Sequence, residues 1–211
     1  MPPTPDPGFN VKLYSSPASP FARKVRALII ETGQSDTVEI IDTSGNALDP
    51  GTHPTALNPT SKIPVLEREA GPALYDSRVI CRFLDARAEG GLYPDPPRLW
   101  DTLTLEATAD AIMEAALLMV YEGRLRPEDK QFAGWVEAQW SKVATALDHI
   151  EARWMSHLYG RLDMGQIAVA CALGYLDLRH GGRNWRSGRD ALAAWHAGLA
   201  ARPCLAETAP V

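Results

Sequence analysis

The chain has few cysteines, no long apolar run and no surplus of positive charge, and each absence excludes a class of protein. Cys81, Cys171 and Cys204 are odd in number, far apart and without a CxxC pair, which argues against a disulfide scaffold or a zinc site. No apolar segment reaches the roughly 18 residues that cross a bilayer. The net charge of −5 offers no general attraction for nucleic acid or anionic lipid. We therefore expect a cytoplasmic protein without a metal, a nucleic-acid partner or a membrane partner.

Proline marks the clearest boundary in the chain. Three prolines occur within four positions at the end of residues 91–97, a composition typical of a stiff, extended linker. The proline-rich segment 1–8 has neither the charge nor the apolar run of a signal peptide, and we expect a disordered leader there. The sequence thus predicts a first domain over residues 9–90 and a second over 98–211.

The two domains differ in their expected elements. Before the linker, the pattern predicts strands and helices in alternation, and after it only helices. Ser19 is a favourable N-cap and Pro20 suits a first helical position. Cys81 and Cys171 lie among apolar residues and are expected in the core. The expected strands are 9–15, 37–41, 64–67 and 73–75, and the expected helices are 20–33, 76–89, 98–122, 128–157, 163–178 and 190–201, with a polar loop over 42–58.

A serine begins the first expected helix, where an anion could bind. As a plain cap, Ser19 needs no ligand. Its hydroxyl could also donate to an anion, helped by the helix dipole. To lower a thiol pKa from about 8.5 to about 6.5 requires roughly 2.7 kcal/mol, and one hydrogen bond to a charged group supplies about 1.5–3 kcal/mol. Ser16 lies close enough to compete for the role. Neither serine has a histidine or acid nearby in the sequence to make it a conventional nucleophile.

Two further segments place binding groups at the ends of elements. The Ile63-Pro64 bond is expected to be trans from the residues alone, since only about 5–6% of such bonds are cis. A cis bond would turn the Ile63 N–H and C=O outward to pair with a peptide-like ligand. Asp76 and Ser77 could simply cap a helix. Alternatively, Ser77 could receive a carboxylate and Asp76 an ammonium, which together recognise an α-amino acid head group.

The order of these segments resembles the cytosolic glutathione transferases, most closely bacterial serine- or cysteine-type members near the zeta, omega and beta classes. The resemblance runs from Val11 to nearly the end of the chain. It implies a thioredoxin-like N-terminal domain of βαβαββα order followed by an α-helical bundle. It also implies a cis proline after Ile63. Ser19 falls where the family carries its serine or cysteine, with Ser16 as the second choice. The glutathione-binding residues that the resemblance implies are Phe21, Lys62, Ile63, Pro64, Asp76 and Ser77.

The resemblance implies that the protein conjugates the glutathione thiolate to a small electrophile, with glutathione as co-substrate, and that it is a homodimer. Two alternatives remain: a non-catalytic glutathione-binding or regulatory protein of the same fold, and a glutathione-dependent isomerase or dehalogenase. A serine at position 19 argues against reductase chemistry, because serine cannot form a mixed disulfide.

A few residues of the second half extend this interpretation. Asp163 and Gln166 resemble the family's capping box, in which two side chains satisfy orphan amides reciprocally. Met113, Leu117 and Tyr121 share one helix face that could border the second substrate, although core packing is the alternative. In the first half, Tyr14 is expected inside its strand and in the protein core. His53 is the one histidine that could reach a bound carboxylate.

Overall fold

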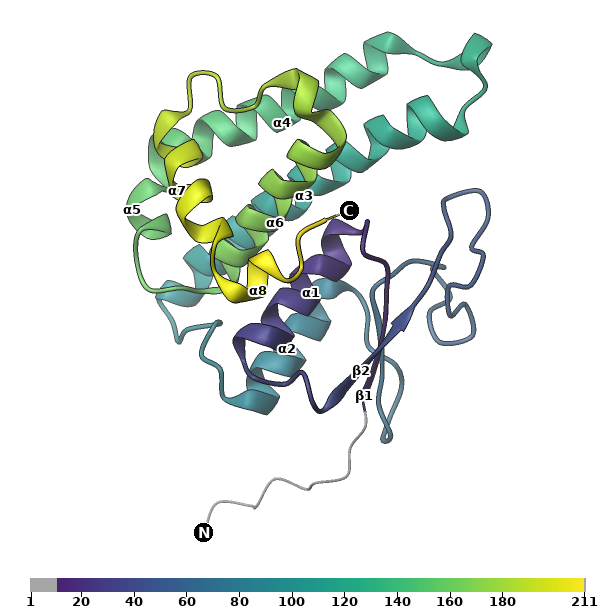
Figure 1. Cartoon of the computed structure of the whole chain (residues 1–211), viewed down its shortest axis with the longest axis vertical. Helices are drawn as coiled ribbons and strands as arrows, with labels where there is room; N and C mark the ends of the chain where they lie inside the picture. Colours follow the sequence, from purple (N-terminus) through teal and green to yellow (C-terminus); the bar gives the residue numbers. More distant parts are fainter. Residues whose placement is uncertain (1–10, 211) are drawn as a thin grey trace.

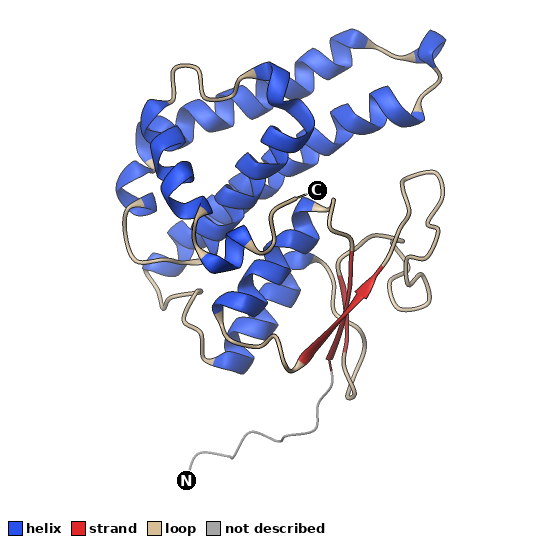
Figure 2. Ribbon diagram, viewed as in Figure 1, coloured by secondary structure: helices blue, strands red, loops and turns tan. Residues whose placement is uncertain are grey.

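A mixed three-stranded sheet forms the base of the N-terminal half in this computed structural model, which describes residues 11–210 (Figure 2). The expected leader at residues 1–8 lies outside the described residues. The strand order is β2-β1-β3. β1 (Val11–Ser15) runs parallel to β2 (Val38–Asp42) and antiparallel to β3 (Val65–Glu67). Alternate β1 residues are buried, so one face of the sheet packs on the core.

Two helices cover that face of the sheet (Figure 1). α1 (Pro20–Glu31) and α2 (Ser77–Ala88) pack against each other. Each begins at a side-chain N-cap, and α1 carries its proline at the first helical position. Gly33 follows α1 with φ +68°, a left-handed conformation that glycine adopts without steric cost. The helices predicted from capping residues and apolar spacing are confirmed in both places.

The thioredoxin-like class is confirmed, but its expected βαβαββα order is wrong in two places. Between β2 and β3 the described chain forms turns rather than a second helix, as the predicted loop over 42–58 requires. Four prolines between residues 50 and 64 prevent helix propagation, and Asn46 Oδ1 accepts from the amides of Leu48 and Asp49 to hold a turn. The expected strand 73–75 is reduced to one bridge between Leu66 and Leu74.

The second half of the described chain is all-helical, as predicted. α3 and α6 form its central pair and pack most extensively on each other. The single helix expected over 128–157 is instead interrupted twice, and its middle part is α4. The elements are α3 (Arg98–Leu125), η1 (Glu128–Lys130), α4 (Ala133–Arg153), α5 (Met155–Leu158), α6 (Met164–His180), η2 (Gly181–Arg183), α7 (Asp190–Ala200) and α8 (Pro203–Ala206). The domain limits at residues 91–97 stay a prediction.

The cap of α6 is only half of the expected capping box. Asp163 Oδ1 accepts from the Gln166 amide at 3.2 Å, as expected. The Gln166 side chain does not return the bond to Asp163. Its Nε2 donates instead to the carbonyls of His157 and Arg161, at 3.2 and 2.8 Å. The long Gln166 side chain therefore donates to backbone carbonyls that precede α6, rather than pairing with the cap residue Asp163.

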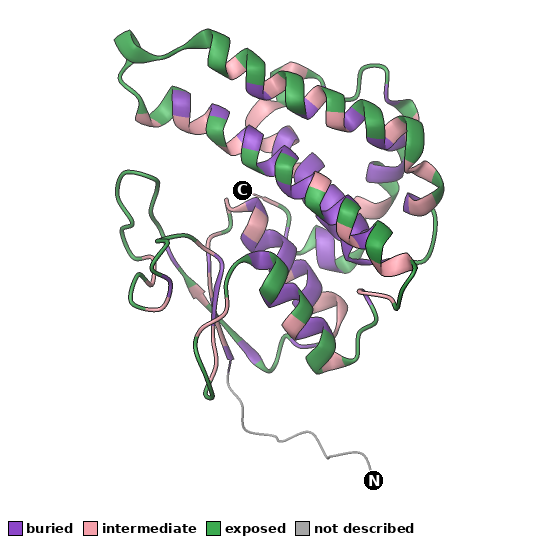
Figure 3. Ribbon diagram, turned by 180° about the vertical axis from the view of Figure 1, so that it is seen from behind, coloured by how far each residue is buried: buried purple, intermediate pink, exposed green. Residues whose placement is uncertain are grey.

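One hydrophobic core runs through both halves of the molecule. Figure 3 shows buried residues concentrated where α1, α3 and α6 meet, whereas the loop between β2 and β3 is mostly exposed. Cys81 and Cys171 are completely buried there, which confirms their expected place, and burial raises the pKa of both thiols. Within residues 11–210, no helix is both long and apolar enough to cross a membrane.

Gly174 on α6 is required by the close approach of α1. Arg23 is buried, and its Nη2 donates to the Leu205 carbonyl at 3.1 Å. A Cβ added at Gly174 would overlap Nη1 of Arg23. By contrast, a Cβ added at Gly198 on α7 meets no atom within 4 Å.

We predict opposite stability effects for the same substitution at these two helical glycines. Gly174→Ala should destabilise the protein by about 1–3 kcal/mol, because the buried Arg23 guanidinium must shift and would strain its hydrogen bond to the Leu205 carbonyl. Gly198→Ala should stabilise it by up to about 1 kcal/mol through helix propensity. Urea denaturation of both variants measures the difference, and equal effects of the two substitutions would contradict the packing argument.

Candidate functional site

Four chain segments meet at one edge of the sheet. β3 is antiparallel to β1, with Tyr14 opposite Val65, so the end of β1 lies beside the start of β3. Leu74 pairs antiparallel with Leu66, so the segment before α2 runs toward the same edge. α1 and α2 therefore both begin there (Figure 1). Two helix N-termini at one edge provide partial positive charge and free amides for anions.

Ser19 caps α1 and lies directly after the turn that follows β1. Its Oγ accepts from the Ala22 amide at 3.3 Å, and its own amide donates to the Ser16 carbonyl at 3.0 Å. The cap uses a lone pair of the hydroxyl oxygen and leaves the hydroxyl proton free to donate. Ser16 is half-buried in the same turn. The structure thus places both predicted serines together at the N-terminus of α1.

The Ile63-Pro64 bond is cis, as the family resemblance implies. Neither the N–H nor the C=O of Ile63 forms a hydrogen bond with another residue of the described chain. Asn58, which is buried, supports this segment: its Oδ1 accepts from the Thr60 amide at 3.0 Å and its Nδ2 donates to the Lys62 carbonyl at 2.8 Å. A peptide-like ligand could therefore pair with the backbone of Ile63 without displacing a bond of the protein.

Asp76 and Ser77 begin α2, with Asp76 as the N-cap. Asp76 Oδ1 accepts from the Arg78 amide at 3.0 Å, and Oδ2 accepts from Nη2 of Arg78 at 3.1 Å. Ser77 is buried, and its amide is one of the first-turn N–H groups without an intrahelical acceptor. Burial raises the pKa of Asp76, but the hydrogen bond and charge of Arg78 outweigh it and leave the pKa below its ordinary value. The cap is thus a carboxylate held ionised beside a free amide.

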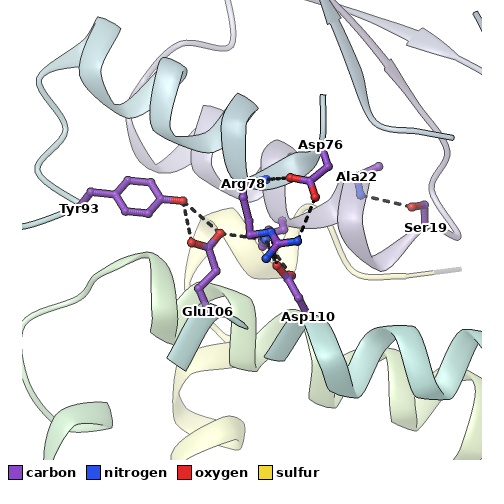
Figure 4. A network of polar contacts seen from close by, with 8 residues as sticks. Ser19, Ala22, Asp76, Arg78, Tyr93, Glu106 and Asp110 are labelled. Atoms are coloured by element: carbon purple, nitrogen blue, oxygen red, sulfur yellow. Dashed lines mark hydrogen bonds and ion pairs between the residues drawn. The ribbon is translucent and has the colours of Figure 1, made fainter. Parts of the chain in front are cut away.

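A chain of charged side chains, exposed at Arg78 and buried beyond it, connects this cap to the helical half (Figure 4). Nε of Arg78 lies 3.4 Å from Asp110 Oδ2 on α3. Asp110 also contacts the amino group of Lys24 on α1, at 2.8 and 3.1 Å. Lys24 reaches Glu106 at 2.9 Å, and the Tyr93 hydroxyl donates to both Glu106 oxygens. One network therefore joins α1, α2, α3 and the linker.

Burial and neighbouring charges set the ionisation of this network. Burial lowers the pKa of Lys24, but the charges of Asp110 and Glu106 raise it more, so the amino group stays protonated. Burial raises the pKa of Glu106, and the charge and hydrogen bond of Lys24 lower it by less, so this pKa stays above its ordinary value. Lys24 contacts both oxygens of Asp110 but only one of Glu106.

Other residues singled out in the sequence have more ordinary surroundings. Phe21 is half-buried against the core, and Lys62 is exposed. Tyr14 is in its strand but not in the core: it is half-buried, and its hydroxyl donates to Glu67 at 2.8 Å, which raises the pKa of the phenol. His53 Nδ1 lies 3.0 Å from the Ser61 carbonyl, within the loop.

The residues proposed to border a second substrate differ in burial. Met113 is completely buried in the core. Leu117 and Tyr121 are half-buried farther along the same face of α3, and burial raises the pKa of Tyr121. Core packing accounts for Met113, as the alternative interpretation held.

Sequence reasoning missed Lys24, Arg78 and Asp110, although signals for two of them were present. Lys24 lies three residues after Phe21 and four before Leu28, so it occupies the apolar face of α1. A cation on such a face indicates a buried anionic partner. Asp110, three residues before Met113, lies on the predicted inner face of α3.

Two family profiles match the chain. Residues 18–87 match the N-terminal domain of glutathione S-transferases, and residues 133–198 match the C-terminal domain. Among curated proteins, an uncharacterized GST-like protein of Escherichia coli, YibF, is 32% identical over 204 residues, which cover 95% of this chain and 98% of that protein.

Solved structures show the same likeness in three dimensions. A glutathione transferase family member from Pseudomonas fluorescens with bound glutathione is 40% identical and superposes with a TM-score of 0.93, covering 96% of this chain and all of that chain. A glutathione S-transferase from Methylobacillus flagellatus with bound glutathione is 34% identical with a TM-score of 0.84, at 96% and 100% coverage. The protein described here therefore belongs to the glutathione S-transferase family.

Proposed function

We propose that this protein is a glutathione transferase that uses Ser19 to keep the glutathione sulfur ionised. The observation that carries the proposal is the meeting of two helix N-termini at one sheet edge, one with a neutral hydroxyl and the other with a carboxylate and a free amide. The bound glutathione in the Pseudomonas and Methylobacillus relatives supports the choice of ligand. The proposal also includes a serine- or cysteine-type class near the zeta, omega and beta classes, and a cytoplasmic location.

Each end of glutathione has a partner of matching chemistry. The Ile63 backbone would pair with the cysteinyl backbone as an added strand, next to Pro64 and Lys62. Ser77 would receive the γ-glutamyl carboxylate, and Asp76 the ammonium. The Ser19 hydroxyl, with Ser16 as the second choice, would donate to the sulfur, which lies beside Phe21 at the start of α1. These roles are assigned by chemistry and by the position of each group at the common edge.

The reaction needs no ionisation of the serine. The thiol proton leaves to solvent, and the thiolate accepts the Ser19 O–H hydrogen bond. The sulfur lone pair then forms a bond to an electrophilic carbon. Either a leaving group departs with its electron pair, or a conjugated double bond opens and its α-carbon takes a proton from water.

The direct test combines binding and turnover. Calorimetry with reduced glutathione should show uptake, and acrylic acid is a suitable first electrophile because the Pseudomonas protein has also been seen with S-(propanoic acid)-glutathione. Formation of the thioether above the uncatalysed rate supports the transferase. Binding without turnover of acrylic acid or a chlorinated nitroarene favours the non-catalytic alternative, whereas thiol-dependent isomerisation or dehalogenation without adduct release favours the third. No uptake of glutathione refutes the proposal.

We also propose a homodimer, as is usual in the family. Leu48 in the loop between β2 and β3 is 75% exposed, and Val79 on α2 is 46% exposed. Such apolar side chains are favourable at a subunit interface. Light scattering of the purified protein should give twice the chain mass, and the double variant Leu48→Asp/Val79→Asp should give the single-chain mass. A wild-type protein of single-chain mass contradicts this proposal.

We predict that Ser19→Ala raises the pKa of bound glutathione by about 1–2 units, because one charge-assisted hydrogen bond of about 1.5–3 kcal/mol is lost. At pH 7, a rise of this pKa from about 6.5 to about 7.5–8.5 lowers the thiolate fraction, and with it the conjugation rate, about 3- to 25-fold. Ultraviolet thiolate absorbance against pH measures the shift directly.

Two control variants separate this role from helix capping. Ser19→Asp keeps a strong N-cap but replaces the donor with a negative charge, so stability should be retained and the thiol pKa should rise further. Ser16→Ala should leave the pKa unchanged. If Ser16→Ala raises it and Ser19→Ala does not, the role passes to Ser16.

We predict that Asp76→Asn weakens glutathione binding at least about tenfold, because the ammonium loses its charged partner. Asparagine caps a helix as well as aspartate does, so the melting temperature should hardly change. Calorimetry with N-glutaryl-Cys-Gly, which lacks the α-amino group, supplies the control: this analogue should bind the variant and the wild type equally. Equal loss for both ligands would contradict an Asp76–ammonium pair.

A further inference from the structure

Lys24 is a buried cation whose amino group forms its hydrogen bonds with side chains of another helix. Its side chain is completely buried in α1, and its amino group contacts Glu106 at 2.9 Å and Asp110 at 2.8 and 3.1 Å. α1 packs more extensively on α6 than on α3. Within the described residues, Lys24 provides the side-chain hydrogen bonds between α1 and α3.

Asp110 is shared between two cations of different helices. Lys24 approaches it from α1, and Nε of Arg78 approaches it from α2 at 3.4 Å. The same guanidinium donates through Nη2 to Asp76 at 3.1 Å. Figure 4 shows this path from the interior of the molecule to the cap of α2. Arg78 thus donates a hydrogen bond to an exposed carboxylate and forms an ion pair with a buried one.

The two carboxylates compete unequally for Arg78. The Asp110 side chain is only 6% exposed, whereas that of Asp76 is 57% exposed. A buried carboxylate needs a cationic partner more than a solvated one does, because water cannot replace the lost interaction. As long as Lys24 neutralises Asp110, Arg78 can keep its bond to Asp76. Without Lys24, Arg78 becomes the sole cation beside Asp110 and is drawn toward it.

We propose that Lys24 is a positioning residue for glutathione recognition: it holds Asp110, so that Arg78 stays on Asp76 and orients that carboxylate for the α-ammonium of the ligand. This inference rests on the proposed function. Lys24 touches neither the ligand nor the reacting atoms, and it acts through Asp110 and Arg78. The electrostatics agree, since the charge of Lys24 is among the influences that lower the pKa of Asp76, after the larger effects of burial, which raises it, and of Arg78.

The test compares two ligands in the full-length protein. Calorimetry gives the ratio of dissociation constants for N-glutaryl-Cys-Gly and glutathione, which measures recognition of the α-ammonium alone. Lys24→Met should reduce this discrimination about tenfold relative to wild type. A purely structural role would weaken both ligands equally and leave the ratio unchanged. The double variant Lys24→Met/Asp110→Asn should restore much of the discrimination, because the buried carboxylate that contacts Arg78 is then replaced by a neutral amide.

Two variants control for a general loss of buried polar contacts. Arg23→Met removes the neighbouring buried cation, which donates to the Leu205 carbonyl and not to Asp110. Tyr93→Phe removes the hydrogen bonds to Glu106 only. Both should keep the wild-type ratio. If Lys24→Met does not fold, Lys24→Gln removes the charge, keeps one donor, and should give the same reduction.

The outcomes separate this inference from the proposed function. Wild-type protein that takes up no glutathione overturns both. If the wild-type protein discriminates between the two ligands and a folded Lys24 variant discriminates equally well, only the role of Lys24 is overturned. Failure of the double variant to recover any discrimination contradicts the competition for Arg78.

Discussion

The buried ammonium of Lys24 between two carboxylates of α3 is the interaction on which the relation of the two halves depends. Removing three charges from water is costly, and the cost is offset only where every group finds partners. Here the Tyr93 hydroxyl donates a second hydrogen bond to Glu106, and Arg78 forms a second ion pair with Asp110. A slide of α1 along α3 by one turn, about 5.4 Å, would separate every pair at once. Apolar packing alone tolerates such shifts more easily, because it has no direction.

The chemistry of the site follows from strand direction. β3 runs away from the edge where α1 begins, and the antiparallel segment through Leu74 returns the chain, so α2 begins at the same edge and both positive helix ends face the same region. The proposed ligand, a tripeptide with a thiolate at one position and an α-carboxylate at another, has one anionic group for each of these ends. The helical half does not need to supply a binding group for this purpose. Through Asp110, it instead contacts the side chain of Arg78 on α2.

The sequence predicted elements that depend on local rules and missed those that depend on long-range competition. The caps Ser19 and Asp76 and the long loop after β2 follow from residue preferences within a few positions. The family order suggested a second helix in the N-terminal half, whereas repeated prolines opposed it. The described chain forms turns between β2 and β3, so the local residue preferences prevailed over the family order. The contact of Lys24 with Asp110 spans 86 positions. Periodicity marks both residues as inward-facing, but nothing in a single sequence says which inward-facing charges meet.

The serine at position 19 caps α1, and the same hydroxyl is suited to the thiolate-binding role proposed for it. A hydroxyl oxygen has lone pairs and one proton, so accepting from the Ala22 amide leaves the proton available. Aspartate would cap α1 equally well but would repel an anion, and alanine would neither cap nor donate. Cysteine could ionise and form covalent intermediates, which directs the same position toward redox exchange. A neutral donor that is already oriented by the helix cap therefore suits the proposed role of Ser19, which is to stabilise a thiolate without reacting with it.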